Sequence, residues 1–402
     1  MKKLALVVPS LAEGGGVPAV ARFVKDAALR SGRYELQLIS LCISSNESTS
    51  LQMTRPATWL RGVTTRSGQW EGLPYIHVGA NWGELEFQRY KPRKVLTQLL
   101  ANCDVIQVVC GSPAWAHAVV GLGKPVALQV ATRAIVERRR RDGNSVGLKG
   151  AWRRAMTPIT NRYDDKALRS VDAIQVENLW MLDYAKKLNT GRAVDLRYAP
   201  PGVNTARFTP LTSSDWQQDP YILCVGRLSD PRKNIGLLLE AYALLPAAVQ
   251  KQTRLVLAGS SGPDEVFWQR AQALGLRDLI TFHRFPSQAE LIGLYQKAAI
   301  FVLPSDEEGL GVVLLEAMSC GIPVISTSSG GPDGIISEGV DGFLTPLDDA
   351  GRMAQRIEML LNDAALHQRM GLAARDKAVN CYDEVMTGNA FVDTWDKLLD
   401  QR

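Results

Sequence analysis

The chain has 402 residues, of which 46% are hydrophobic and 22% charged. This composition excludes a disordered or fibrous protein, and the length suits two domains of roughly 100–200 residues each. The formal net charge of +5 is too small to indicate a nucleic-acid partner by itself.

The first predicted element is an apolar strand over residues 4–9, followed by the loop AEGGGV at 12–17 and a helical pattern over 20–31. The apolar run stops at Pro9, which is too early for a secretory signal, so we expect it to be a strand. Glycines between a strand and a helix let backbone amides approach a phosphate. A plain tight turn explains the loop equally well, because it matches neither a dinucleotide-binding nor a Walker motif.

Further short apolar runs recur along the chain, and most are followed by a turn and an amphipathic stretch. This alternation predicts parallel sheets covered by helices on both faces. The expected strands are residues 36–41, 105–110, 125–130, 173–176 and 197–198, then 221–225, 254–258, 279–282, 300–303, 323–326 and 342–345. The expected helices include residues 236–245, 265–274, 287–297 and 312–320.

Two segments of the first half have side chains that could contact an acceptor or a surface. Residues 77–90 mix aromatic, amide and charged side chains, including Glu84 and Glu86, a mixture that suits sugar binding as well as it suits a packed loop and helix. Residues 133–169 carry a net charge of +7, so the rest of the chain sums to −2. The segment is either a solvated face or a surface for anionic lipid headgroups, formed by Arg133, Arg138, Arg139, Arg140 and Arg141.

Residues 199–219 contain Pro-Pro-Gly and a serine pair, which is typical of a linker. We therefore predict a first domain over 1–200 and a second over 201–379. A final helix in 380–402 is expected to pack back on the first domain. The six cysteines form no CxxC pair, which favours a reducing, cytoplasmic setting, and no metal site is expected.

The second half opens with the pattern VGRLS at 225–229, followed by Lys233. Arg227 follows a predicted parallel strand, and ligands of α/β proteins bind at that end of the sheet. An arginine and a lysine converging there suit a diphosphate, since arginine offers paired donors and lysine a compact charge. A solvated basic turn is the alternative, and it explains the strand-end position poorly.

The segment SDEEGLGVVLLEAM at 305–318 carries the most information. Glu308 precedes a predicted helix and Glu316 lies within it, so their separation is on the order of 12 Å along the helix axis. A glycosidase pair lies only about 5–9.5 Å apart, which disfavours a hydrolase with two carboxylates. The spacing instead suits a ligand with a sugar at one end and a ribose at the other. A diphosphate between them would meet the helix start, which comprises Gly309, Leu310, Gly311 and Val312.

These motifs resemble the family 4, or group 1, retaining glycosyltransferases of GT-B fold. The resemblance rests on GGG at 14–16, VGRLS with Lys233, PPGVNTARFTP at 200–210, EGLGVVLLEAM at 308–318, CGIPVIST at 320–327, GG at 330–331 and DGFLTP at 341–346. It implies two Rossmann-like domains facing a central cleft. It also implies transfer of a sugar from a UDP, GDP or dTDP donor to a glycan or lipid-linked glycan.

The resemblance also implies roles for individual residues. Arg227 and Lys233 would bind the diphosphate and stabilise the leaving group, while Glu308 would bind the donor sugar. Glu316 would hold the ribose, and Gly15 or Gly16 would approach the phosphate. The chain departs from the family pattern because its four histidines lie outside the usual donor-contacting positions, which predicts that Gln129, Thr132 or Arg133 lines that wall.

No Asp-x-Asp triplet occurs in the sequence, so we expect transfer without a metal ion or other cofactor. The expected setting is bacterial cell-surface polysaccharide synthesis, such as lipopolysaccharide, O-antigen or capsule, in the cytoplasm or at the inner face of the cytoplasmic membrane. No nucleic-acid partner is expected. The alternatives are a synthase that makes a soluble disaccharide or glycoside and an adaptor that binds nucleotide sugars without catalysis.

Overall fold

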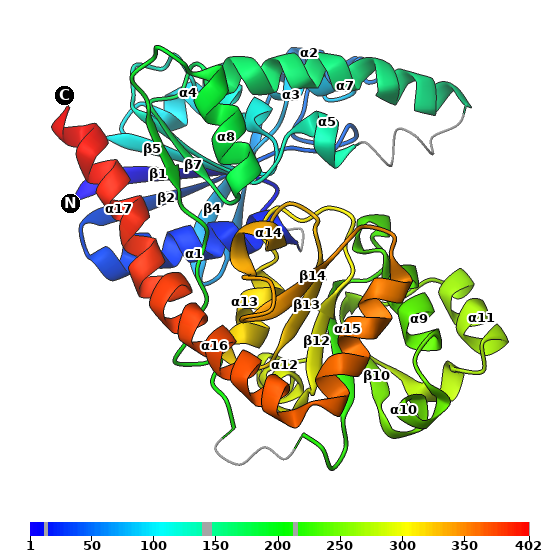
Figure 1. Ribbon diagram of the computed structural model, residues 1–402. Helices are drawn as coiled ribbons and strands as arrows, with labels where there is room; N and C mark the ends of the chain where they lie inside the picture. The colour runs from blue at the N-terminus through cyan, green and yellow to red at the C-terminus, as the bar shows by residue number, and fades with distance from the viewer. Residues whose placement is uncertain (12–14, 139–146, 212–215, 402) are drawn as a thin grey trace. The chain divides into compact units, whose positions relative to one another are not determined.

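The chain folds into two compact units in the computed structural model, which describes residues 1–11, 15–138, 147–211 and 216–401 (Figure 1). The first unit comprises Met1–Pro201 with Thr387–Arg402, and the second comprises Gly202–Met386. The boundaries expected from the sequence were 200/201 and 379/380. The chain therefore returns to the first unit later than expected, inside its last helix.

The first unit is built on a sheet that has eight strands in the described residues, ordered β3-β4-β2-β1-β5-β6-β7-β8. Neighbouring strands pair in parallel, apart from β3, which pairs antiparallel with β4 at one edge. The strands are β1 (Lys2–Pro9), β2 (Tyr34–Leu41), β3 (Thr65–Trp70), β4 (Leu73–Val78), β5 (Val105–Cys110), β6 (Val126–Val130), β7 (Ala173–Val176) and β8 (Asp195–Tyr198).

Helices cover both faces of this sheet. The helical elements of this unit are α1 (Gly16–Ser31), α2 (Ala57–Arg61), α3 (Glu86–Arg89), α4 (Lys94–Leu100), η1 (Pro113–Ala118), α5 (Ala134–Glu137), α7 (Gly147–Leu168), α8 (Leu179–Leu188) and the last helix, α17 (Glu384–Asp400). The apolar faces of α4, α7 and α8 pack together with the sheet in one core, and those of α1 and α17 in another. None of the helices in the described ranges has the length and apolar character that crossing a membrane requires.

Helix α17 is part of the first core although it lies at the end of the chain (Figure 1). Its Phe391 meets Phe23 of α1 edge to face, with ring centroids 5.5 Å apart. Trp395 is fully buried, and its indole N–H donates to Gln107 Oε1 of β5 at 2.7 Å. Strand β5 thus places the polar Gln107 side chain on the sheet face that α17 covers, and the Trp395 indole provides it with a hydrogen bond inside the core.

The second unit contains a parallel sheet of six strands among its described residues, ordered β11-β10-β9-β12-β13-β14. The strands are β9 (Tyr221–Arg227), β10 (Arg254–Ser261), β11 (Ile280–Arg284), β12 (Ile300–Leu303), β13 (Val324–Thr327) and β14 (Gly342–Thr345). The helical elements are η2 (Pro231–Lys233), α9 (Ile235–Ala243), α10 (Ala247–Gln252), α11 (Glu265–Ala273), η3 (Arg277–Leu279), α12 (Gln288–Lys297), α13 (Val312–Ser319), α14 (Pro332–Ile335), α15 (Ala350–Asn362) and α16 (Ala364–Tyr382).

Two hydrophobic cores flank this sheet. One core joins α9, α11 and α15 to the sheet, and the other joins α12 and α13 to the opposite face, while α16 contributes to both. Strand order reverses between β9 and β12, which lie side by side and run parallel. In doubly wound sheets the carboxyl ends of the strands at such a reversal open a crevice that binds ligands. The predicted fold class of two parallel α/β domains is confirmed.

Candidate functional site

The candidate site lies at the carboxyl edge of the second sheet, where β9 and β12 end. Arg227 is the last residue of β9, and the segment that leads to Glu308 follows β12. Two of the segments predicted from the sequence, VGRLS and SDEEG, are therefore neighbours at the strand reversal.

The turn after β9 leaves Arg227 partly exposed. Asp230 caps η2 by accepting from the Arg232 backbone N–H at 3.1 Å, and its carboxylate also accepts from the Arg232 side chain at 2.8 Å. Burial favours the protonated acid, but the hydrogen bond and charge of Arg232 prevail and hold the pKa of Asp230 below its ordinary value. Arg227 Nη2 lies 3.5 Å from Asp230 Oδ2, the limit of a hydrogen bond, and its side chain is 42% exposed. Its guanidinium is thus positioned at the sheet edge and open to an anion.

Lys233 and Glu308 form an ion pair between the two segments. Glu308 Oε1 accepts from Lys233 Nζ and, at 2.8 Å, from the hydroxyl of Ser305. The Lys233 side chain is 20% exposed and that of Glu308 only 10%. A pair shielded to this degree is screened less by solvent than a surface pair, and both charges are held in one place.

Backbone and side-chain hydrogen bonds tie the two segments together beside this pair. The Asp306 N–H donates to the Arg232 carbonyl at 2.8 Å, and Asn234 Nδ2 donates to Asp306 Oδ1 at 2.7 Å. Asn234 has a left-handed backbone with φ of 42°, which asparagine tolerates better than most residues. This bend brings Lys233 round towards Glu308 before α9 begins.

A glycine pair supports the Glu308 segment from the side. The Glu308 N–H donates to the Ser329 carbonyl at 3.0 Å, and the Gly331 N–H donates to the Glu308 carbonyl at 2.9 Å. A methyl group on Gly331 would lie 2.6 Å from Cα and the carbonyl oxygen of Leu310. The Gly-Gly motif at 330–331 is therefore explained by the close approach of two backbones.

Helix α13 begins directly after this segment. Gly311 is its N-cap residue, with φ of 89°, and no side chain caps the first turn. The backbone amides at Gly311 and Val312 form the positive end of the helix, the feature for which these positions were selected from the sequence.

Glu316 lies in the second turn of α13 and is half-buried. Its Oε2 accepts from the hydroxyl of Tyr295 at 2.7 Å, and Tyr295 on α12 is fully buried. Burial raises the pKa of Glu316 to about 7, against the opposing effect of the Tyr295 hydrogen bond. Tyr295, Ser305 and Asn234 were missed in the sequence. Tyr295 in particular occupies an ordinary core position of an amphipathic helix and gives no signal of its own.

The glycine loop of the first unit lies at the corresponding edge of the other sheet. Gly15 is the N-cap of α1 with φ of 138°, and Gly16 has open space where a side chain would begin. They follow β1, next to the strand reversal between β1 and β5. Gly14 lies outside the described residues.

The expected basic surface needs a correction, because two of its arginines are used inside the first unit. Arg133 is 9% exposed, lies 3.9 Å from the ring centroid of Tyr184 and pairs with Asp165 at 2.6 Å. Arg138 forms a forked ion pair with Glu86, in which Nη1 donates to Oε2 at 3.1 Å. These cations face the protein because partly buried carboxylates attract them, which a count of charges along the sequence does not reveal. Arg139, Arg140 and Arg141 lie outside the described residues.

The two carboxylates expected to meet an acceptor also have partners. Glu86 accepts from the Tyr90 hydroxyl at 2.6 Å and from the Thr160 hydroxyl at 3.3 Å, so its carboxylate is part of an internal network with Arg138. Glu84 accepts from the hydroxyl of Thr54 at 3.1 Å. Gln129 is fully buried and donates to Glu177, so the expectation that it lines a binding wall is wrong.

Comparison with known proteins agrees with the resemblance seen in the motifs. Residues 213–377 match the family of glycosyl transferases group 1. A putative glycosyltransferase, EpsD, of Bacillus subtilis is 32% identical over 208 residues, covering 50% of this chain and 54% of that protein. A GDP-mannose-dependent α-(1-6)-phosphatidylinositol monomannoside mannosyltransferase of Mycolicibacterium smegmatis is 30% identical over 205 residues, covering 47% and 53%. The chain thus spans about half the length of these curated relatives.

Among solved structures, Anabaena HepE in complex with UDP-glucose is similar over 99% of this chain and all of that one, with a TM-score of 0.70 and 15% sequence identity. At this identity the likeness concerns the fold alone. The resemblance to group 1 glycosyltransferases and the GT-B fold are confirmed.

Proposed function

We propose that the protein is a retaining glycosyltransferase whose second unit binds the nucleotide-sugar donor. The observation that carries the proposal is the meeting of Arg227, Lys233 and Glu308 at the strand reversal of the second sheet. Two cations and a carboxylate at one sheet edge suit a ligand that carries a diphosphate next to a sugar. The family match over residues 213–377 supports the same reading.

Each residue has a distinct part in the proposed reaction. Arg227 and Lys233 bind the diphosphate together with the amides at the start of α13, and their charges stabilise it as it departs. Glu308 accepts hydrogen bonds from the donor sugar, and Glu316 accepts them from the ribose. The bond between the anomeric carbon and the diphosphate breaks, and the acceptor oxygen forms its bond on the same face. The acceptor proton passes to the departing phosphate oxygen.

Transfer is proposed to need no metal ion. The positive charge that a divalent ion would supply to the diphosphate comes here from two side chains and a helix start, all held before the donor arrives. Lys233 keeps its place through Glu308, and Arg227 through the turn at Asp230.

The proposed acceptor is a glycan or lipid-linked glycan in the synthesis of a bacterial surface polysaccharide, handled in the cytoplasm or at the inner face of its membrane. The Mycolicibacterium relative, which by its name acts on a phosphatidylinositol mannoside, supports a lipid-linked acceptor. The proposed donor is a UDP-, GDP- or dTDP-sugar. HepE, which is in complex with UDP-glucose, supports the first, and the relative named GDP-mannose-dependent supports the second.

Thermal-shift titration against UDP-, GDP- and dTDP-sugars tests the donor site. A ligand present at 100 times its Kd stabilises the protein by about 2.7 kcal/mol, which a melting curve detects. Lys233→Ala and Glu308→Ala should abolish the shift, while Lys251→Ala, at an exposed lysine of α10, should preserve it. A full shift in the Lys233→Ala protein would overturn the site assignment.

Turnover then separates the reaction from mere binding. The wild-type protein should transfer the sugar to lipid-linked acceptors with retention, which NMR of the product anomer establishes. Faster transfer to a lipid-free sugar would favour a synthase of soluble glycosides. Donor binding without transfer to any acceptor of the panel would favour an adaptor.

A further inference from the structure

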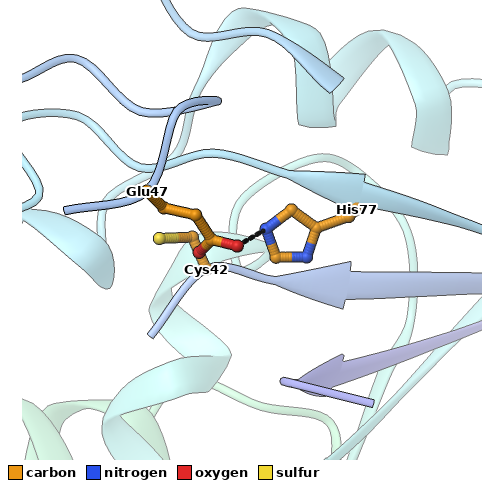
Figure 2. A group of neighbouring side chains, drawn as sticks. All are labelled: Cys42, Glu47 and His77. Carbon is orange, nitrogen blue, oxygen red and sulfur yellow. Dashed lines mark ion pairs between the residues drawn. The ribbon is translucent and has the colours of Figure 1, made fainter. Parts of the chain in front are cut away.

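Three side chains with metal-binding atoms, none of them assigned a role above, converge in the first unit (Figure 2). Cys42 directly follows β2, Glu47 lies in the loop after it, and His77 is on the neighbouring strand β4. One ligand atom from each lies within 4.8 Å of the others. Among the described residues, no other group of three or more Cys, His, Asp or Glu side chains brings its ligand atoms this close together.

Two of the three side chains are buried, and one buried atom lacks a hydrogen bond. Cys42 is fully buried and His77 is 5% exposed. His77 Nε2 lies 3.0 Å from Glu47 Oε1, but it makes no hydrogen bond of good geometry with that oxygen or any other atom. A buried ring nitrogen without a hydrogen bond destabilises the fold. A cation placed between the nitrogen and the carboxylate would satisfy both.

Neighbouring groups orient the three side chains. His77 Nδ1 lies 3.2 Å from Ser40 Oγ, so the ring is held by its far nitrogen while Nε2 faces the cluster. The hydroxyl of Ser50 donates to Cys42 Sγ at 3.2 Å. Outer partners of this kind fix the tautomer and the ring plane of metal-binding histidines.

The loop that carries Glu47 is held in place as well. The Glu47 carbonyl accepts from the Ser50 N–H at 3.0 Å and from Gln52 Nε2 at 2.8 Å. Beside it, Ser50 Oγ accepts from the Ala80 N–H at 2.8 Å, which ties the loop to the segment after β4. The arrangement therefore exists before any ion binds.

We propose that Cys42, Glu47 and His77 bind one Zn²⁺ ion. Sulfur, imidazole nitrogen and carboxylate oxygen are the ligand types of zinc, and three of them leave a fourth tetrahedral position for water or another small ligand. The thiol releases its proton to solvent when it binds the ion.

The ion would fasten residues 42–52 to the edge of the first sheet and takes no part in the proposed transfer step. This departs from the expectation that the chain holds no metal. That expectation rested on the absence of an Asp-x-Asp triplet and of CxxC cysteine pairs. Here the ligands come instead from two parallel strands and a loop, which only the fold brings together.

Cobalt binding tests the site without reference to activity. The full-length protein, with the exposed Cys381 replaced by serine to remove background binding, is stripped with a chelator and titrated with Co²⁺. We expect one ion per chain, a sulfur-to-cobalt charge-transfer band in the near ultraviolet, and displacement of the band by Zn²⁺. The band should vanish in Cys42→Ser and should persist in His283→Gln, at an exposed histidine.

Glu47→Gln provides a milder variant, since this side chain is 23% exposed and its loss should leave the fold intact. Competition titration should show its zinc affinity reduced at least 10-fold. Absence of the band in the wild-type background would overturn the proposal. Persistence of the band in Cys42→Ser, or unchanged zinc affinity in Glu47→Gln, would overturn it too.

Discussion

Replacement of Gly331 by alanine should impair the candidate site by moving the segment that carries Glu308. The backbone of Gly331 has φ of −67° and ψ of −53°, which alanine adopts without strain, so the effect is one of contact alone. The added methyl carbon would lie 2.6 Å from Cα and O and 2.7 Å from C of Leu310. All three are backbone atoms, so the Leu310 segment must shift.

The expected size of the effect follows from two opposing contributions. Overpacking of this kind costs about 1–3 kcal/mol. The entropy that alanine removes from the unfolded chain returns about 0.4–1 kcal/mol. A net loss on the order of 1–2 kcal/mol lowers the melting temperature by about 2–4 °C per kcal/mol for a unit of this size. Displacement of Glu308 by about 1 Å would lower kcat/KM by on the order of 100-fold.

Gly293→Ala is the matched control. Gly293 lies inside α12 of the same unit, and a methyl group there would meet no atom within 4 Å. Alanine in a helix interior should stabilise the protein by roughly 0.5–1 kcal/mol and leave turnover unchanged. Thermal melts and donor kinetics on both variants decide the matter. Equal melting temperatures and equal kcat/KM for Gly331→Ala and Gly293→Ala would refute the role assigned to the contact between Gly331 and Leu310.

Three further outcomes are expected. Donor affinity, measured by calorimetry across a pH series, should rise as Glu316 ionises near pH 7. Tyr295→Phe should move the midpoint of this rise to higher pH, because the hydrogen bond that is lost stabilises the ionised carboxylate. An unmoved midpoint would contradict the role assigned to Glu316. Arg138→Ala should lower the free energy of unfolding by about 1–3 kcal/mol in a denaturant titration, because it removes the arginine partner of the Glu86 carboxylate. Arg55→Ala, at an exposed arginine, is the control and should lower it by less than about 0.5 kcal/mol. Transfer should continue in excess EDTA without added metal, and activity that EDTA removes and Mg²⁺ restores would refute metal independence.

Much of the fold follows from local patterns in the sequence. The parallel strands are apolar runs because both of their faces are buried, and the strand ends mark where loops with Arg227 and Glu308 begin. The antiparallel edge formed by β3 and β4 was missed. Its outer strand, Thr65–Trp70, is mostly polar and exposed, so it carries no apolar run to reveal it.

The parts of the site that sequence reasoning missed are those whose function depends on a partner far along the chain. Tyr295 is a core residue by its pattern, and only the packing of α12 beside α13 makes it a hydrogen-bond donor to Glu316. Arg138 belongs to a conspicuous basic run, yet its charge is used by Glu86. Residue type and spacing indicate what chemistry a side chain can perform, whereas the partner decides whether that chemistry is available.

The ion pair between Lys233 and Glu308 shows how such a partner can prepare a site. Lys233 needs a counter-charge in the absence of an anion, and Glu308 supplies it, while the Ser305 hydroxyl holds the same Glu308 oxygen at 2.8 Å. In the proposed function, the ammonium group turns its three donors towards the diphosphate of the donor, and Glu308 stays in place because Ser305 still holds it. The carboxylate is then released to accept from sugar hydroxyls. The ion pair therefore positions both side chains before the proposed donor binds, which reduces the side-chain ordering that binding would otherwise require.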